Sequence, residues 1–261
     1  GTRGSKVSIL ASELAPSDKL KLSYKSFSTQ YGEEKQGSAS VANISTSADK
    51  LQLSLRYRKA DGNFNLNQSD ETLWQSFRSE YGLGGNNAGE VVAQARDRSY
   101  MDLNASYKLS PKLGFQFSRS TVDYGKQSIG RANAKDTVDN WRMDWDNGPR
   151  LKVNYATTNW TGHDKLSGNE AINNYNVLNV ASQLPVAGKD FSFNYKRELT
   201  TTDGNTRDVT GAAEILKQSY NLEGSVLPNF KLKADLVTTG FNSTRSEEHT
   251  SELQFTASYL V

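Results

Sequence analysis

The sequence predicts an all-β fold, an antiparallel up-and-down sheet of roughly 12–14 strands. The first observation is strict alternation, since Met101, Leu103 and the apolar residues that follow to position 109 alternate with polar ones. A period of two indicates a strand with one apolar and one polar face. The second observation is the tight break Ser110-Pro111-Lys112, after which the alternation resumes and predicts a hairpin. The third is that this hairpin recurs along the chain.

Taken in order, the predicted strands flank short turns. Residues 7–11 and 20–24 flank Pro16-Ser17-Asp18, and a weaker run at 41–46 and a clean one at 51–57 flank residues 47–49. Later turns are predicted at 146–149, 185–188 and 227–229, each followed by renewed alternation, and the last run covers residues 253–261. Between hairpins the chain is longer and polar. Short turns at one end and long loops at the other are typical of a transmembrane β-barrel.

Composition favours such a barrel over a soluble core. The chain has 261 residues, of which 35% are hydrophobic and 10% aromatic, and its mean hydropathy is −0.69. A soluble sandwich of this length needs apolar residues in bulk, whereas a barrel needs one thin outward band. We therefore expect a single domain over residues 1–261. An odd count of roughly thirteen runs predicts that at least one strand is missing at the N-terminus, because bacterial barrels have even strand numbers.

Tyrosines support the same interpretation. Tyr24, Tyr57, Tyr155 and Tyr195 each follow a turn by several residues on the apolar face, where an interfacial aromatic girdle would lie. The alternative is that they pack between the two sheets of a sandwich.

Residues 61–98 interrupt the alternation and predict a long loop insertion with a short helix. Ser69 is the expected N-cap, Trp74, Phe77 and Tyr81 fall on one face, and Gly82 marks the end. Residues 84–87 are expected to form a flexible connection. The insertion could enter the lumen as a constriction, or it could pack externally on its neighbours. In the first arrangement its carboxylates would face a basic wall; they are Asp70, Glu71 and Glu80.

That basic wall is the predicted polar face of the strands. We predict ten pore-lining cations: Lys21, Lys25, Arg56, Arg58, Lys108, Arg142, Lys152, Lys196, Lys231 and Lys233. Six carboxylates share the face: Asp102, Asp144, Glu198, Glu223, Asp235 and Glu252. The cationic excess predicts a water-filled pore with a mild preference for anions. A solvated sheet face is the alternative interpretation.

Catalytic and metal sites are not predicted. The chain has no cysteine and two histidines, His163 in a polar loop and His249, so neither a histidine-based triad nor a histidine-rich metal site can be assembled. We expect no enzyme activity, no metal and no cofactor. The net charge of +2 predicts no nucleic-acid partner.

The last run resembles the final strand of bacterial outer-membrane β-barrel proteins, porins among them. Leu253, Phe255, Ala257, Tyr259 and Val261 fill the alternate positions that the barrel-assembly machinery recognises, although this chain has Val where that family usually ends in Phe or Trp. The resemblance implies a location in the bacterial outer membrane, contact with its lipid and with the assembly machinery, and passive passage of small solutes.

Two alternatives stay open. Turns such as Ser110-Pro111-Lys112 and 227–229 also resemble large barrels that sheathe multihaem electron conduits, which would imply a lumenal or periplasmic protein partner such as an electron-transfer protein. The other alternative is a soluble or surface-attached adhesin or carbohydrate-binding module, with Trp141, Trp145 and Trp160 as stacking residues.

Residues 245–254, RSEEHTSELQ, are identical to the translation of a widely used sequencing-library adapter. This segment, which includes His249, is given no functional weight.

Overall fold

The computed structural model describes residues 5–33, 35–186, 188–205, 210–227, 230–243 and 247–259. The predicted chain end at Val261, the turn residues 187 and 228–229, and residues 245–246 of the adapter-like segment lie outside these ranges.

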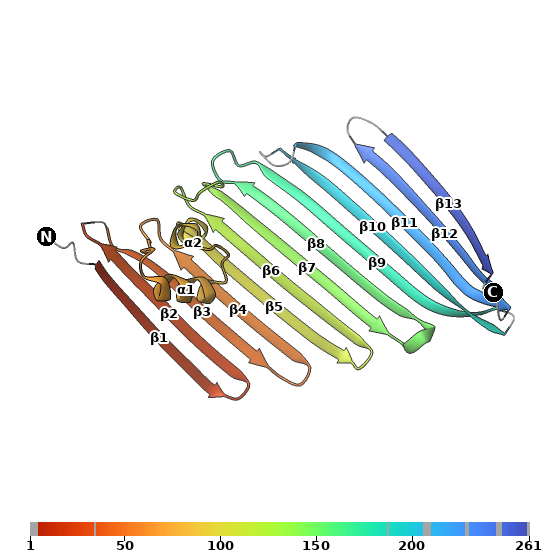
Figure 1. Cartoon of the computed structure of the whole chain (residues 1–261), viewed down its shortest axis with the longest axis horizontal. Helices are drawn as coiled ribbons and strands as arrows, with labels where there is room; N and C mark the ends of the chain where they lie inside the picture. The colour runs from red at the N-terminus through yellow and green to blue at the C-terminus, as the bar shows by residue number, and fades with distance from the viewer. Residues whose placement is uncertain are drawn as a thin grey trace. The chain divides into compact units, whose positions relative to one another are not determined.

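The described residues contain thirteen antiparallel strands and two α-helices, and the strands are hydrogen-bonded to one another in chain order (Figure 1). The strands are β1 (Ser5–Ser17), β2 (Leu20–Tyr31), β3 (Gly37–Ser47), β4 (Leu51–Ala60), β5 (Arg98–Ser110), β6 (Leu113–Tyr124), β7 (Ala134–Asp146), β8 (Lys152–Asp164), β9 (Glu170–Val186), β10 (Lys189–Asn205), β11 (Thr210–Leu227), β12 (Phe230–Ser243) and β13 (Glu247–Tyr259). The helices are α1 (Glu71–Tyr81) and α2 (Ala88–Ala95), with a 3-10 turn η1 at Gly148–Arg150. The predicted all-β, up-and-down sheet is confirmed. Among the described residues β1 and β13 are the two ends of this order and do not pair with each other, so the sheet is not closed; that it belongs to a closed barrel stays a prediction.

Contacts divide the chain into two compact units. Unit 1 comprises residues 1–105, 118–137 and 162–168, and unit 2 comprises residues 106–117, 138–161 and 169–261. Unit 1 therefore holds β1–β4, both helices and one end of each of β5–β8. Unit 2 holds the other ends of those four strands together with β9–β13. That the chain forms a single domain stays a prediction.

In unit 1 the strand register separates two faces, as the alternation predicts. Lys25 pairs with Val41, and Val41 pairs with Arg58, so these three share what we call the polar face. One residue along, Tyr24 and Tyr57 both pair with Ala42 on the opposite, apolar face. Both tyrosines are about two-fifths exposed, at 43% and 40%.

Unit 2 repeats this division. Tyr195 pairs with Tyr220 and their rings lie 4.8 Å apart, whereas Lys196, one residue along, pairs with Ser219 on the other face. Large apolar side chains of unit 2 are exposed; among them are Tyr107, Leu109, Phe115, Trp141, Trp145, Tyr155 and Leu184.

Strand β1 departs from the predicted pattern. Its apolar residues Val7 and Ile9 pair with Thr29 and Phe27, and therefore lie on the polar face of unit 1. Its apolar face carries Leu10 and Leu14, which are 64% and 61% exposed. β1 thus carries apolar residues on both of its faces, so alternation alone does not tell which side is outward.

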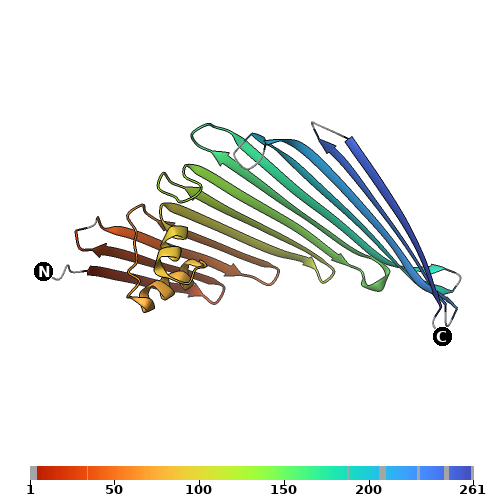
Figure 2. The same cartoon turned by 45° about the horizontal axis from the view of Figure 1, so that its top comes forward.

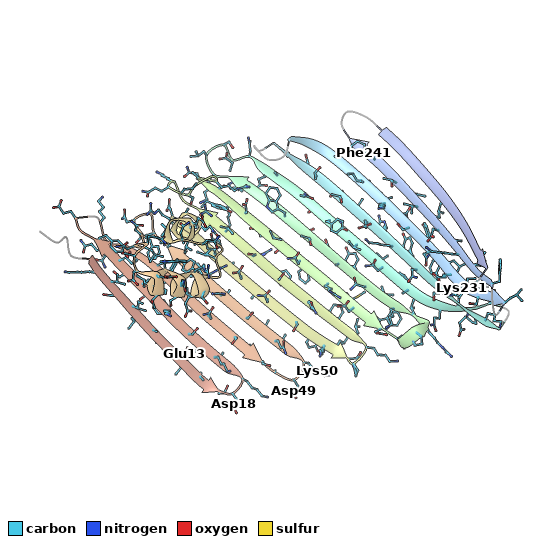
Figure 3. All side chains as sticks on the ribbon, in the orientation of Figure 1. Glu13, Asp18, Asp49, Lys50, Lys231 and Phe241 are labelled. Carbon is cyan, nitrogen blue, oxygen red and sulfur yellow. The ribbon has the colours of Figure 1, made fainter. Side chains whose placement is uncertain are left out.

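The predicted short turns fall where strands end. Asp18 lies between β1 and β2, and Asp49 and Lys50 lie between β3 and β4, at the same end of the unit 1 strands (Figure 3). In Figure 3, Lys231 and Phe241 mark the two ends of β12. Several loops are shorter than predicted because the strands continue further, and His163 lies within β8 and not in a loop. Among the described residues, neither helix has the length and apolar character needed to cross a bilayer.

Candidate functional site

The helical insertion packs on the polar face of unit 1. Its buried side chains form one cluster with Phe27, Ala39, Val41 and Ala60 of β2–β4. Phe27 pairs with Ala39, and Ala39 pairs with Ala60, so all of them lie on the face that carries Lys25 and Arg58. Both helices stand on this side of the strands in Figures 1 and 2. The insertion therefore covers the part of the basic wall around Lys25 and Arg58 and leaves the apolar face of unit 1 open.

Local sequence explains why α1 begins and ends where it does. Asp70 is the N-cap, and its side chain accepts a hydrogen bond from the Leu73 backbone N–H. The predicted cap, Ser69, is one residue too early; its hydroxyl donates to Asn67 instead. Gly82 ends α1 as predicted, with φ +66°, and its N–H donates to the Ser79 carbonyl.

The buried face of α1 is the one predicted. Trp74, Phe77 and Tyr81 are all buried, and Phe77 is at the centre of an aromatic group. Its ring lies 5.1 Å from that of Phe27 in an edge contact, 4.7 Å from Phe64 and 4.4 Å from Tyr81. Burial of these rings fixes the helix to β2 through the hydrophobic effect, which is not directional but is large for aromatic side chains.

A second helix, α2, directly follows residues 84–87, the predicted connection, whereas the sequence predicted one short helix in the insertion. Asn87 is its N-cap and accepts from the Glu90 N–H at 3.0 Å, while the Asn87 amide donates to the Glu90 carboxylate at 2.8 Å. This reciprocal arrangement resembles a capping box, except that Glu90 accepts from the Asn87 side-chain amide and the Asn86 backbone N–H and not from the Asn87 backbone N–H. The signal was present in the sequence as Asn87 three residues before Glu90, followed by Val91, Val92 and Ala95, which are buried.

Arg58 is the main polar contact between the wall and the insertion. Its guanidinium donates to the Tyr81 carbonyl and forms an ion pair with Asp102 of β5. The same group lies over the Tyr100 ring, 4.7 Å from its centroid. Arg58 is only 8% exposed. A cation at the last carbonyls of a helix also opposes the negative end of the helix dipole.

Lys25 and Arg56 hold the same end of α1. The Lys25 ammonium donates to the Glu80 carboxylate at 2.7 Å. Arg56 donates to the Glu80 backbone carbonyl. Three predicted wall cations thus converge on the C-terminal turn of one helix.

Tyr81 is enclosed by this packing. Burial raises the pKa of its phenol well above the usual range, and the nearby Arg58 guanidinium opposes this shift only in part. The buried phenol therefore stays protonated under conditions in which an exposed tyrosine ionises.

Of the three predicted constriction carboxylates, only Glu80 contacts the wall. Asp70 is used as the helix cap, and Glu71 accepts a hydrogen bond from Gln75 one turn later on the exposed side of α1.

The predicted wall cations of unit 2 have a different environment. Four of them form ion pairs with nearby carboxylates: Arg142–Asp144 at 2.7 Å, Lys152–Asp146 at 2.9 Å, Lys196–Glu198 at 2.8 Å and Lys233–Asp235 at 3.0 Å. Lys21 in unit 1, and Lys108 and Lys231 in unit 2, are exposed. Whether any of the ten lines a pore stays a prediction.

The three predicted stacking tryptophans do not share a face of unit 2. Trp141 and Trp145 lie on the apolar face of β7 and are 52% and 36% exposed. Trp160 lies two residues after Thr158, whose hydroxyl donates at 2.7 Å to Asn140 on the opposite face.

Comparison with known proteins assigns no family. No protein-family model and no curated protein matches the chain. A solved structure described as a bacterial polysaccharide outer membrane secretin is similar, with a TM-score of 0.37 and 8% sequence identity over 98% of this chain and 80% of that one. This degree of similarity is too low to place the chain in a family. Of the predicted resemblance to outer-membrane barrels, the all-β antiparallel sheet is confirmed.

Proposed function

We propose that the chain forms a bacterial outer-membrane channel, or part of one, in which the helical insertion narrows the lumen. The channel passes small solutes passively with a mild preference for anions, and it is not an enzyme. Its partners are outer-membrane lipid, the barrel-assembly machinery and the solutes. The observation that carries the proposal is the asymmetry of unit 1, whose polar face is covered by helices while its apolar face is exposed.

The exposed apolar face supports a lipid environment. Leu10, Leu14, Tyr24, Ile44 and Tyr57 are each 40% exposed or more, although they belong to four neighbouring strands. A surface of this kind is costly in water and favourable against lipid. The adhesin alternative is weakened because Trp160 lies on the face opposite to Trp141 and Trp145.

The mild selectivity follows from the ion pairs. Within the described part of the chain, six of the ten predicted wall cations form an ion pair with a carboxylate. A passing ion would therefore meet less positive charge than the number of cations suggests, so the expected preference for anions is mild.

The membrane orientation is tested by labelling single cysteines, because the chain has none of its own. Ile44 and Ser45 are adjacent on β3 and lie on the apolar and polar faces respectively. In liposomes, a membrane-impermeant thiol reagent should modify Ser45→Cys and leave Ile44→Cys protected. Equal labelling of both, or a folded chain that needs no amphiphile, would contradict the proposal.

The narrowing is tested by removing the insertion. The Asp97 N–H donates to the Asp61 carbonyl at 3.3 Å, so an Asn-Gly turn can replace residues 62–96 without moving β4 or β5. Single-channel conductance should rise. The reversal potential in a salt gradient should also shift toward the equilibrium potential of the anion, because the deletion removes Glu80 and leaves the charge of Lys25 without its partner. A matched variant with a shortened 165–169 loop should conduct like the parent. Unchanged conductance after the deletion would place the insertion outside the conduction path.

A further inference from the structure

A polar recess of about 400 Å³ lies on the polar face of unit 1, beside the C-terminal end of α1. Side chains from four strands line it, including Asn43, Ser54, Arg56, Asp102, Asn104 and Ser120. The volume is in the range of small-ligand sites. No aromatic residue is among those that line it, so the recess offers hydrogen bonds and charge but no stacking surface.

The carboxylate in the recess is already satisfied. Asp102 accepts from Arg58 on one oxygen and from the Ser120 hydroxyl on the other, at 2.6 Å. Arg58 itself lies under α1 and neutralises that carboxylate. Asp102 therefore has little capacity left to bind a cationic ligand.

Arg56, unlike Asp102, has hydrogen-bonding capacity left. Its one hydrogen bond among the described residues goes to a neutral acceptor, the Glu80 carbonyl, and its Nε is buried without a partner. No carboxylate of the described residues lies within ion-pair distance of it, although the charges of Asp102 and Glu80 act on it from further away. The guanidinium thus keeps both its charge and unused donors, which suit an anionic oxygen.

Two amides add acceptors. The Asn43 amide nitrogen donates to Ser23 at 2.9 Å, and that of Asn104 points to Ser54 at 3.5 Å. Among the described residues neither amide oxygen accepts a hydrogen bond, so both are left as acceptors, which suits a ligand hydroxyl.

We propose that this recess binds a small hydroxylated monocarboxylate, with its carboxylate on Arg56 and its hydroxyls on Asn43 and Asn104. This inference deepens the proposed function and rests on it, since it names the solute class for which the channel would have an internal site. A neutral sugar would leave the charge of Arg56 unused, and a bare carboxylate would leave the two amide oxygens unused.

The test is isothermal titration calorimetry on the full chain refolded in detergent, with gluconate, glucose and acetate as probes at fixed ionic strength. Gluconate should bind, and glucose and acetate should each bind roughly tenfold more weakly or not at all, because each lacks one of the two kinds of contact. Equal affinity for glucose and gluconate, or no measurable gluconate binding, would overturn the proposal.

Two variants locate the binding. Arg56→Gln removes the charge that would bind the gluconate carboxylate. Asn104→Asp keeps the side-chain shape, lies away from the insertion and adds a negative charge that repels gluconate. Each variant should bind gluconate roughly tenfold more weakly than the parent. Asn194→Asp makes the same change on the polar face of unit 2 and should bind gluconate like the parent. Since Arg56 also holds α1, protease protection of residues 62–96 checks its fold. Normal binding by Asn104→Asp, or equal weakening by Asn194→Asp, would contradict a site in the recess.

Binding and conductance are measured separately, so the two proposals can fail separately. If the chain conducts but does not bind gluconate, the proposed binding site in the recess is wrong and the proposed channel still stands. A chain that binds gluconate in detergent but never conducts in a bilayer overturns the channel and, with it, the role given to the site.

Discussion

The polar faces of the two units carry the same kinds of residue in different environments. In unit 1, Arg58 is buried beneath α1 and Lys25 contacts Glu80 of that helix. In unit 2, Arg142 and Lys196 form ion pairs with carboxylates two residues away on their own strands, and their side chains are about half exposed, at 54% and 46%. One set of cations holds an inserted segment, and the other neutralises charges of the sheet itself.

This difference shows the limit of alternation as a predictor. A period of two determines which face a side chain occupies, because successive Cβ atoms point to opposite sides of a strand. It does not determine what covers that face. In unit 1 the cover comes from a segment that follows β4 in sequence and returns over β2 and β3.

The largest expected effect comes from the aromatic centre of unit 1. Phe77→Ala should lower the free energy of unfolding by about 3–5 kcal/mol, because the ring is fully buried. Urea unfolding in detergent, with protease protection of residues 62–96, would measure it. The control Phe115→Ala, on the exposed apolar face of unit 2, should cost about 1 kcal/mol or less. Similar losses for both would remove the distinction between the units.

Next comes the buried ion pair. Arg58→Met should cost about 3 kcal/mol, since Asp102 is left without its cation and the Tyr81 carbonyl without a donor. Arg142→Met breaks an exposed pair in unit 2 and should cost about 0–1 kcal/mol. Urea denaturation of the two variants compares them directly, and an equal cost would show that Arg58 is solvated like Arg142.

Close approach of the insertion to β3 predicts a smaller effect. A Cβ built at Gly37 would lie 2.4 Å from the Asn63 carbonyl oxygen and the Phe64 Cα, so Gly37→Ala should cost about 1–3 kcal/mol. At Gly114 in unit 2 the nearest atom is 3.9 Å away, and alanine there should be neutral or slightly stabilising. If thermal unfolding midpoints of the two variants agree, the insertion does not press against β3.

Helix capping predicts a cost near 1 kcal/mol. Asp70→Ala removes the acceptor for the Leu73 N–H and should destabilise α1 by about 1 kcal/mol, seen as faster amide exchange in its first turn. Glu71→Ala keeps the cap and should exchange like the parent. Faster amide exchange in Ser69→Ala than in Asp70→Ala would show that Ser69, the residue predicted from sequence, is the N-cap.

The smallest effect appears only at alkaline pH. The pKa of Tyr81 is raised by burial, so above pH about 10 an unfolded chain loses this proton while the folded chain keeps it, and stability falls as pH increases. Tyr81→Phe should reduce that fall, measured as unfolding free energy against pH. An unchanged pH dependence would indicate that the phenol ionises freely in the folded state.

Parts of the insertion were predictable from local sequence. Trp74, Phe77, Tyr81 and Gly82 correctly predicted the buried face and the end of α1. The second helix could have been found from the capping pair Asn87 and Glu90. Both signals act within one or two helical turns, which is why sequence spacing carries them.

The face on which the insertion packs was harder to predict, although β2 holds a signal. Phe27 lies in the polar series of β2, between Lys25 and Thr29, and is completely buried. A large apolar residue on a polar face indicates a covered patch. It does not identify the cover, since any segment of the chain could in principle supply one.

The sequence alone determined the strands, their turns and, outside β1, the face on which side chains lie, because these depend on neighbours one or two positions away. Only the tertiary structure decided that Arg58 is an anchor, that Glu80 and not Asp70 meets the basic wall, and that Arg56 lines a recess with no carboxylate of the described residues within ion-pair distance. These roles depend on contacts between residues more than twenty positions apart. Local periodicity holds no information on such contacts, because they are selected by packing and desolvation of the folded chain.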